Sequence, residues 1–310
     1  MQGFDARPHV REVGWVLIAQ ALAIISALAS LKVATNILGP ADYGRFAVAL
    51  GAAGIVQLCL FGAISQTASR FLFLAKVRNL LTDYFRTIIH LMLLSVPLIL
   101  LSFGMAAVFG LTGNLSFPIW LLFLFLATSG CQQILLAILN AGRARKSVAF
   151  AQGIEALYRP SALAVFSFLG VPGVTMALGV YGSTAGLVAI AGLLMLREQR
   201  KVLAPGAVEP DQSGVDDRTT ANALQRQMWR YTYPFVVFGV VGSLGSHGER
   251  LLLTLWVSWE QVGIYALLSQ LSITPTMLLM TLINQFYLPV IFQQDPEGRA
   301  DFERAFRRYL

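Results

Sequence analysis

Long apolar stretches, separated by short polar segments, occupy most of the 310 residues of this chain. An apolar stretch of roughly 18 residues or more is long enough to cross a bilayer as an α-helix. We therefore expect an all-α, polytopic membrane protein. The pattern predicts about eight membrane helices, over residues 14–38, 44–69, 88–110, 116–140, 148–169, 173–196, 232–257 and 262–288.

The composition agrees with a membrane protein. Hydrophobic residues make up 56% of the chain, charged residues make up 13%, and the mean hydropathy is +0.66. A soluble domain of this length needs more charge on its surface. The first apolar run is too long for a cleavable signal peptide and lacks a cleavage site of small residues.

Lys and Arg, 23 in all, gather on alternate connections between the predicted helices. Because positive residues stay on the cytoplasmic side of a membrane, this pattern predicts a cytoplasmic N-terminus. The net charge of +7 therefore indicates topology and contact with anionic membrane lipids, and it does not indicate a nucleic-acid partner. The basic residues outside the pattern are Arg45, in an opposite connection, and Lys32, Arg159 and Arg250, inside predicted helices.

The first two predicted helices form a hairpin. Gly39-Pro40 ends the first helix, because proline has no N–H and its ring clashes with the preceding turn. The second helix carries small or polar residues at helical spacing, namely Gly62, Ser65, Gln66 and Ser69, and ends on Arg70. Lys32, in the first helix, has two interpretations: it reaches to the membrane interface, or it faces a water-filled cavity and meets an anionic substrate.

Residues 148–169 contain a carboxylate and a guanidinium, Glu155 and Arg159, four positions apart on one helix face. An ionised group in hydrocarbon costs several kcal/mol or more, so both should face the protein interior or water, where they can pair. The pair either only orients helices, or combines an ion-coupling carboxylate with a phosphate-binding arginine. In the preceding helix, Gln132 and Gln133 favour hydrogen bonds between helices.

The predicted helix 232–257 has glycine at every third position from 239 to 248 and a polar face that includes Ser246, His247 and Arg250. The planar fork of Arg250 suits phosphate, which makes it the leading candidate for anion binding. Glu249 beside it is a candidate for ion coupling or charge balance. His247 is either a pH-sensitive group or a hydrogen-bonded structural residue. In the next helix, Ser269 belongs to another polar stripe.

Sequence motifs for catalysis, nucleotide binding or metal binding are missing. There is no G-x-S-x-G, no H-E-x-x-H and no P-loop. Cys59 and Cys131 lie singly in apolar helices, without a C-x-x-C or a His/Cys cluster. We therefore expect no enzyme activity, no cofactor, no metal and no disulfide.

The chain contains a weak internal repeat. A shift of 219 positions places the first hairpin on residues 232–288 without a gap, and it aligns both turns and both polar stripes. The matched pairs include Thr35 with Thr254, Gly44 with Gly263, and Ala47 with Ala266. Repeats of this kind are typical of transporters, whose substrate site lies between the related parts.

Several segments resemble lipid-linked oligosaccharide flippases, the polysaccharide-biosynthesis branch of the multidrug/oligosaccharidyl-lipid/polysaccharide (MOP) exporter superfamily. They are Asn36-Ile-Leu-Gly-Pro-Ala-Asp-Tyr-Gly44, the Thr67-Ala-Ser-Arg70 ending, Glu249-Arg250, and Val262-Gly-Ile-Tyr-Ala266. The resemblance implies two pseudo-symmetric halves and twelve to fourteen helices. This chain would then hold a six-helix half (1–196), a polar cytoplasmic linker (197–231) and the first two helices of the second half with a basic tail (232–310), truncated at the C-terminus.

The resemblance also implies a function. The protein would flip a polyprenyl-diphosphate-linked oligosaccharide from the inner to the outer leaflet of the bacterial cytoplasmic membrane, for surface polysaccharides such as lipopolysaccharide or exopolysaccharide. The alternatives are an ion-coupled drug or small-cation exporter of the same superfamily, and a non-transporting scaffold for polysaccharide assembly. A polysaccharide polymerase and other assembly proteins are the expected partners. The anion contacts would be Arg250, Arg159, Lys32, Arg70, Gln66, Ser246 and Ser269.

Overall fold

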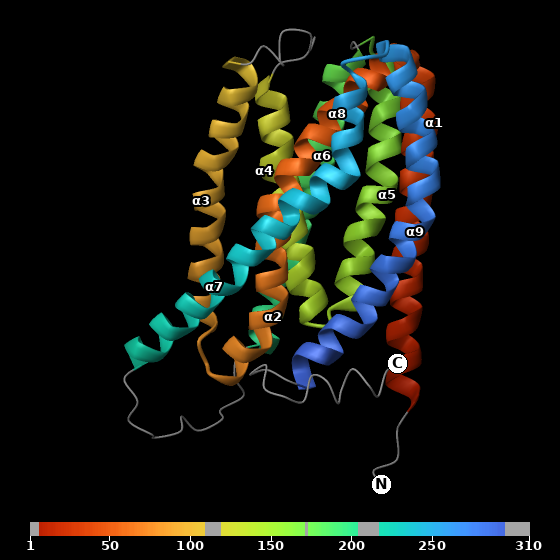
Figure 1. Ribbon diagram of the computed structural model, residues 1–310. Coiled ribbons are helices and arrows are strands. Elements are labelled where there is room, and N and C mark those ends of the chain that lie inside the picture. Colours follow the sequence, from red (N-terminus) through yellow and green to blue (C-terminus); the bar gives the residue numbers. More distant parts are fainter. Residues whose placement is uncertain (1–5, 109–118, 171–172, 204–216, 295–310) are drawn as a thin grey trace.

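The computed structural model describes residues 6–108, 119–170, 173–203 and 217–294, and their regular structure is helical throughout. The all-α prediction is confirmed for this part of the chain. Most of the helices run roughly along one direction and form a bundle (Figure 1). Apolar side chains point both into the bundle and outward, and the outward ones include leucine, phenylalanine and tryptophan residues that are more than half exposed. Such a surface matches a lipid environment.

The first hairpin is formed by α1 (Ala6–Val56), a π-helical turn η1 (Gln57–Gly62) and α2 (Ala63–Val77). The apolar stretch Gly14–Val77 holds 64 residues, which would measure about 96 Å as a straight helix, against roughly 30 Å for the hydrocarbon core. The chain instead turns back at Gly39, whose φ of +68° suits only glycine well, just before Pro40. The predicted turn is therefore confirmed.

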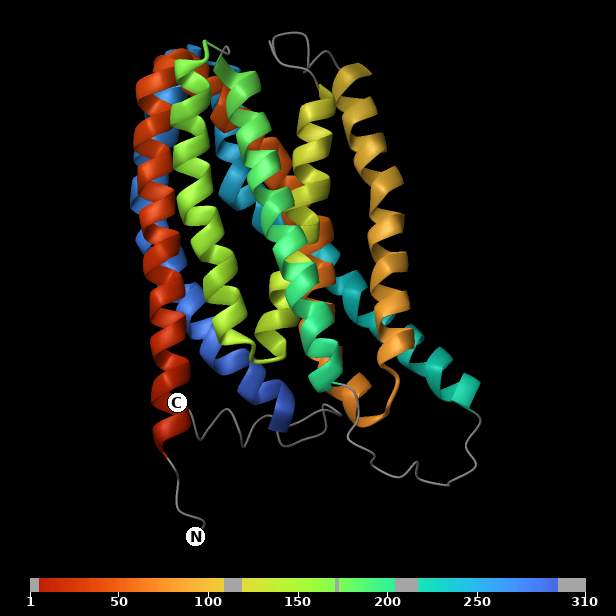
Figure 2. The same ribbon diagram turned by 180° about the vertical axis from the view of Figure 1, so that it is seen from behind.

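Four helices complete the first part of the chain: α3 (Leu81–Val108), α4 (Ile119–Ala141), α5 (Arg145–Phe168) and α6 (Gly173–Leu203). α5 packs against α1 and α6, and α6 packs against α4. α3 packs mainly against α2 and lies at the edge of the bundle (Figure 2). The connections from α2 to α3 and from α4 to α5 lie at the same end, which we call the basic end; the opposite end, with the α1 turn, is the hairpin end.

The last described helices are α7 (Asp217–Ser243), η2 (Leu244–Gly248), α8 (Glu249–Leu253) and α9 (Trp259–Gln294). α7 begins within the segment 197–231, so part of the expected linker is helical. η2 is a π-helical turn that interrupts the predicted helix 232–257 among its glycines. α7 packs on η1 and α2, whereas α9 packs on α1, and the two diverge from the hairpin end towards the basic end (Figure 1).

Four described stretches are long and apolar enough to cross a membrane: Gly14–Val77, Leu81–Leu100, Trp120–Ala141 and Gly173–Glu198. The first of them contains both helices of the hairpin. The stretches predicted at 148–169, 232–257 and 262–288 are not among the four. α5 carries Gln152, Glu155 and Arg159, which lower its hydropathy, and η2 interrupts the predicted helix 232–257. The number of eight membrane helices therefore stays a prediction.

Gly44 and Gly263 form a close crossing between α1 and α9 near the hairpin end. A Cβ added to Gly44 would overlap the backbone oxygen of Trp259, and one added to Gly263 would overlap the backbone oxygen of Pro40. Each Cβ would also lie 3.0 Å from the backbone nitrogen of the other glycine. The shift of 219 positions relates Gly44 to Gly263 and Pro40 to Trp259. The crossing is thus symmetric in the sense that the sequence repeat predicts.

Candidate functional site

A polar cavity of about 450 Å³ lies among α1, η1, α4, α5, α6 and η2. Its volume falls in the range of small-molecule sites. Both apolar and polar side chains line it, and two of the polar ones carry opposite charges. The polar lining comprises Gln57, Ser129, Gln132, Gln133, Glu155, Arg159, Tyr181 and His247.

Glu155 and Arg159 form an ion pair on α5, as the spacing predicted. Their side chains are about one-fifth exposed, at 21% and 18%. Glu155 also accepts a hydrogen bond of 2.8 Å from Gln132 Nε2 on α4. The Arg159 guanidinium lies over the Tyr181 ring of α6, 4.5 Å from its centroid. Arg159 therefore has both a carboxylate and an aromatic face to offset its charge.

Amide side chains connect the helices around this cavity. Gln57 Nε2, on η1, donates a hydrogen bond of 3.3 Å to Gln133 Oε1 on α4. Together with the bond from Gln132 to Glu155, it confirms the predicted role of the two α4 glutamines between helices. Gln57, Ser129 and Tyr181 were not predicted as site residues. The sequence marked each of them only as a polar side chain within an apolar stretch. That the three line the same cavity depends on how η1, α4 and α6 pack together.

His247 reaches from η2 to α1. Its imidazole lies so close to Gly54 that a Cβ there would sit 2.7 Å from His247 Nε2. Its Nδ1 is buried and has no hydrogen-bond partner in the described part of the chain. The predicted hydrogen-bonded structural role is therefore not seen at Nδ1. His247 instead lines the polar cavity, to which it belongs as a residue of η2, in the second part of the chain.

Arg250 belongs to a second cluster, on α8. It is 8% exposed, and its guanidinium donates a hydrogen bond of 3.4 Å to Ser269 Oγ on α9. Its Nε is buried without a partner, and among residues with described side chains no carboxylate lies within ion-pair distance. The neighbouring Glu249 interacts with the hydroxyl of Tyr265. Arg250 is thus a buried cation whose described contacts leave its charge unbalanced.

The other predicted anion contacts do not line the polar cavity. Lys32 is exposed, and Gln66 is partly buried. Arg70 lies over the Tyr231 ring of α7, 4.7 Å from its centroid. Ser246 donates its hydroxyl proton to the Gly242 backbone oxygen, 2.9 Å away. None of the four lines the polar cavity.

In the described part of the chain, no group of three or more His, Cys, Asp or Glu side chains lies close enough together to hold a metal ion. Cys59 and Cys131 are free, and the Cys59 thiol lies 3.5 Å from Ser243 Oγ on α7. These cysteines therefore pack as small side chains between helices.

Comparison with known proteins assigns the family. No curated protein and no solved structure matches the chain significantly. A family model described as "Polysaccharide biosynthesis protein" matches residues 9–294, which include every helix of both clusters. The apolar helical bundle and this match together identify a membrane protein. The chain belongs to the polysaccharide biosynthesis protein family.

Proposed function

We propose that this protein is a transporter that flips a polyprenyl-diphosphate-linked oligosaccharide across a membrane for surface polysaccharide synthesis. The observation that carries the proposal is the buried Arg250 without a described carboxylate partner. A buried charge is costly unless it is paired, so this position favours an anion from outside the protein. A diphosphate supplies that charge, and its oxygens match the guanidinium fork.

The polar cavity with Glu155 and Arg159 has a different role in this proposal. Arg159 is already paired with Glu155, so it offers a neutral, hydrogen-bonding lining for the sugar part of the substrate. Glu155, Glu249 and His247 are the candidates for ion coupling, since each can change its charge. Arg70, Gln66, Lys32 and Ser246 would contact the substrate only in another conformation, because none of them lines the cavity in this one.

Alternating access follows from the repeat. Gly44 and Gly263 bring α1 and α9 into backbone contact at the hairpin end, while α7 and α9 diverge towards the basic end (Figure 1). Rocking of related parts around a fixed site is a common transport mechanism. In this proposal the hairpin end is closed and the basic end is the side of entry. By the positive-inside rule, that side is the cytoplasm, and the membrane is the bacterial cytoplasmic membrane.

The decisive experiment is mass spectrometry of polyprenyl-linked lipids after deletion of the gene. The proposal expects a lipid-linked oligosaccharide to accumulate, with its sugar facing the cytoplasm in a sidedness assay. Complementation with the wild-type gene should restore both the lipid pool and its sidedness. An unchanged lipid pool, with intact surface polysaccharide and no redundant exporter, would overturn the proposal.

The two alternatives predict different results in the same strains. A drug or small-cation exporter predicts altered drug tolerance with a normal lipid pool. A scaffold for polysaccharide assembly predicts accumulated lipid whose sugar still reaches the outer leaflet. It also predicts that neutralising Arg250 changes only stability. A buried arginine without a described carboxylate partner favours the anionic substrate.

A further inference from the structure

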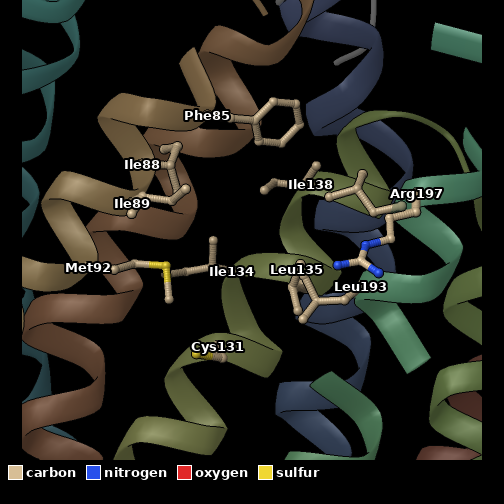
Figure 3. A pocket seen from close by; sticks show the side chains of 11 residues that line it. Phe85, Ile88, Ile89, Met92, Cys131, Ile134, Leu135, Ile138, Leu193 and Arg197 are labelled. Atoms are coloured by element: carbon tan, nitrogen blue, oxygen red, sulfur yellow. The ribbon is translucent and has the colours of Figure 1, made fainter. Parts of the chain in front are cut away.

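A second cavity, separate from the polar one, lies between α3, α4 and α6. Its volume is about 340 Å³, and its lining is almost wholly apolar. Ile88 and Met92 of α3 face Ile134 and Leu135 of α4 across it, and Leu193 and Arg197 of α6 lie beyond (Figure 3). None of these residues lines the polar cavity or contacts Arg250.

The packing of α3 explains why this space exists. α3 packs mainly on α2, with fewer contacts to α7, and stands away from α4 and α6. A space bounded by methyl and methylene groups offers water no hydrogen-bond partners, so it stays dry. An empty space also forfeits the dispersion contacts of its lining. At the surface of a helical bundle in a membrane, the acyl chain of a bilayer lipid can occupy such a cavity.

Arg197 adds a charge to one end of the cavity. It lies near the C-terminal end of α6, and its guanidinium extends along the lining beside Leu135 and Leu193 (Figure 3). This is the basic end, where Lys76, Arg78 and Arg143 also lie. Arg197 is exposed, and its charged head is therefore free to meet a ligand at the membrane interface.

We propose that this cavity binds an anionic phospholipid, with one acyl chain between α3 and α4 and the phosphate on Arg197. Basic pockets between membrane helices on the cytoplasmic side are suited to anionic head groups. The apolar lining accepts any acyl chain, so the arginine alone provides selectivity for the head group. The site does not depend on the transport proposal, because it lies apart from Arg250 and the polar cavity.

The test is native mass spectrometry of the full-length protein, purified in detergent and titrated with phosphatidylglycerol or phosphatidylcholine. The wild-type protein should retain phosphatidylglycerol in preference to phosphatidylcholine. Arg197→Ala should weaken phosphatidylglycerol retention about fivefold, the effect of one basic residue near a membrane surface. Lys146→Ala removes an exposed charge at the same end, outside the cavity, and should change nothing.

A second variant tests the apolar part independently. Met92→Trp keeps every charge and places a bulky ring in the cavity, so it should displace both lipids. Cys131 lies in the lining, and added phosphatidylglycerol should slow its reaction with a maleimide in the wild-type protein but not in Met92→Trp. Thermal unfolding checks that the variants are folded.

Three results would overturn the proposal. The first is equal retention of the two lipids by the wild-type protein. The second is unchanged phosphatidylglycerol retention in folded Arg197→Ala or Met92→Trp. The third is displacement of phosphatidylglycerol by an equal concentration of a polyprenyl phosphate, which would assign the cavity to an isoprenoid chain instead.

Discussion

Arg159 and Arg250 both lie within the helical bundle, but their charges are balanced in different ways. Arg159 has a carboxylate one helical turn away and an aromatic ring under its guanidinium. Arg250 is more deeply buried and has one described hydrogen bond, to the neutral Ser269. Both carry the same charge, so the difference lies entirely in their surroundings. In the proposed function, Arg159 therefore serves the architecture of the cavity, and Arg250 is the residue that binds an anion.

The largest effect is expected from Arg250→Ala. A hydrogen bond to a charged group contributes roughly 1.5–3 kcal/mol, so loss of the guanidinium should lower transport about tenfold or more. Accumulation of lipid-linked oligosaccharide in cells, at equal protein abundance, measures this effect. Arg250→Lys keeps the charge without the planar fork and should retain part of the activity. Normal export by Arg250→Ala would show that this arginine does not hold the substrate.

The next effect should come from pushing α1 and α9 apart at the crossing of Gly44 with Gly263. Gly44→Ala places a methyl group into the backbone of α9, and overpacking of this kind costs about 1–3 kcal/mol. The variant should unfold at a lower temperature and transport poorly. Gly263→Ala should behave alike, because its Cβ meets α1 in the same way. Gly179→Ala is the control, since nothing lies within 4 Å of its added Cβ. Equal stability of all three variants would contradict the symmetric crossing.

A smaller effect is expected at the balanced arginine. Glu155→Gln leaves Arg159 without its carboxylate, which should lower the free energy of unfolding by about 1–2 kcal/mol at this partly exposed site. The double variant Glu155→Gln/Arg159→Gln removes both charges and should recover most of that stability. Thermal unfolding of the purified proteins compares them. A double variant that is stable but does not transport would show that Glu155 has a role beyond charge balance. If both variants are as stable as the wild type, the ion pair does not stabilise the fold.

The smallest effect concerns the ring beneath Arg159. Tyr181→Leu removes the cation–π contact but keeps the ion pair, so a loss of about 1 kcal/mol in stability is expected. Tyr181→Phe keeps the aromatic face and should unfold like the wild type. Thermal unfolding under matched conditions distinguishes the two. A larger loss in Tyr181→Phe than in Tyr181→Leu would mean that the hydroxyl, rather than the ring, supports this cluster.

Local spacing predicted the features that depend on neighbouring residues. Gly39-Pro40 predicted the turn, and a separation of four positions predicted the pairing of Glu155 with Arg159. The repeat predicted the equivalence of Gly44 and Gly263, although not that they would touch. The hydropathy pattern predicted α5 to within a few residues, but α5 and the predicted helix 232–257 are not among the four described stretches that are apolar enough to cross a membrane, because polar residues and a π-helical turn interrupt them.

The candidate site was predictable only in part. Glu155, Arg159 and His247 were candidates and line one cavity, but Gln57 and Tyr181 join them from other helices. Arg250 and Ser269 were candidates and are hydrogen bonded to each other. Lys32 and Arg70 had the right charge and a suitable sequence position, yet neither lies in the cavity. Sequence spacing shows which residues share one helix face, but not which faces of different helices meet.

The sequence by itself therefore determined the helical class, the membrane setting, the first turn and the internal ion pair. Each of these rests on hydrophobicity or on contacts within one helix, where the backbone geometry is known in advance. Only the tertiary structure decided which arginine keeps an unbalanced charge. That outcome depends on how α8 and α9 pack on α1, because contacts between different helices bring Ser269, and no described carboxylate, to the Arg250 guanidinium.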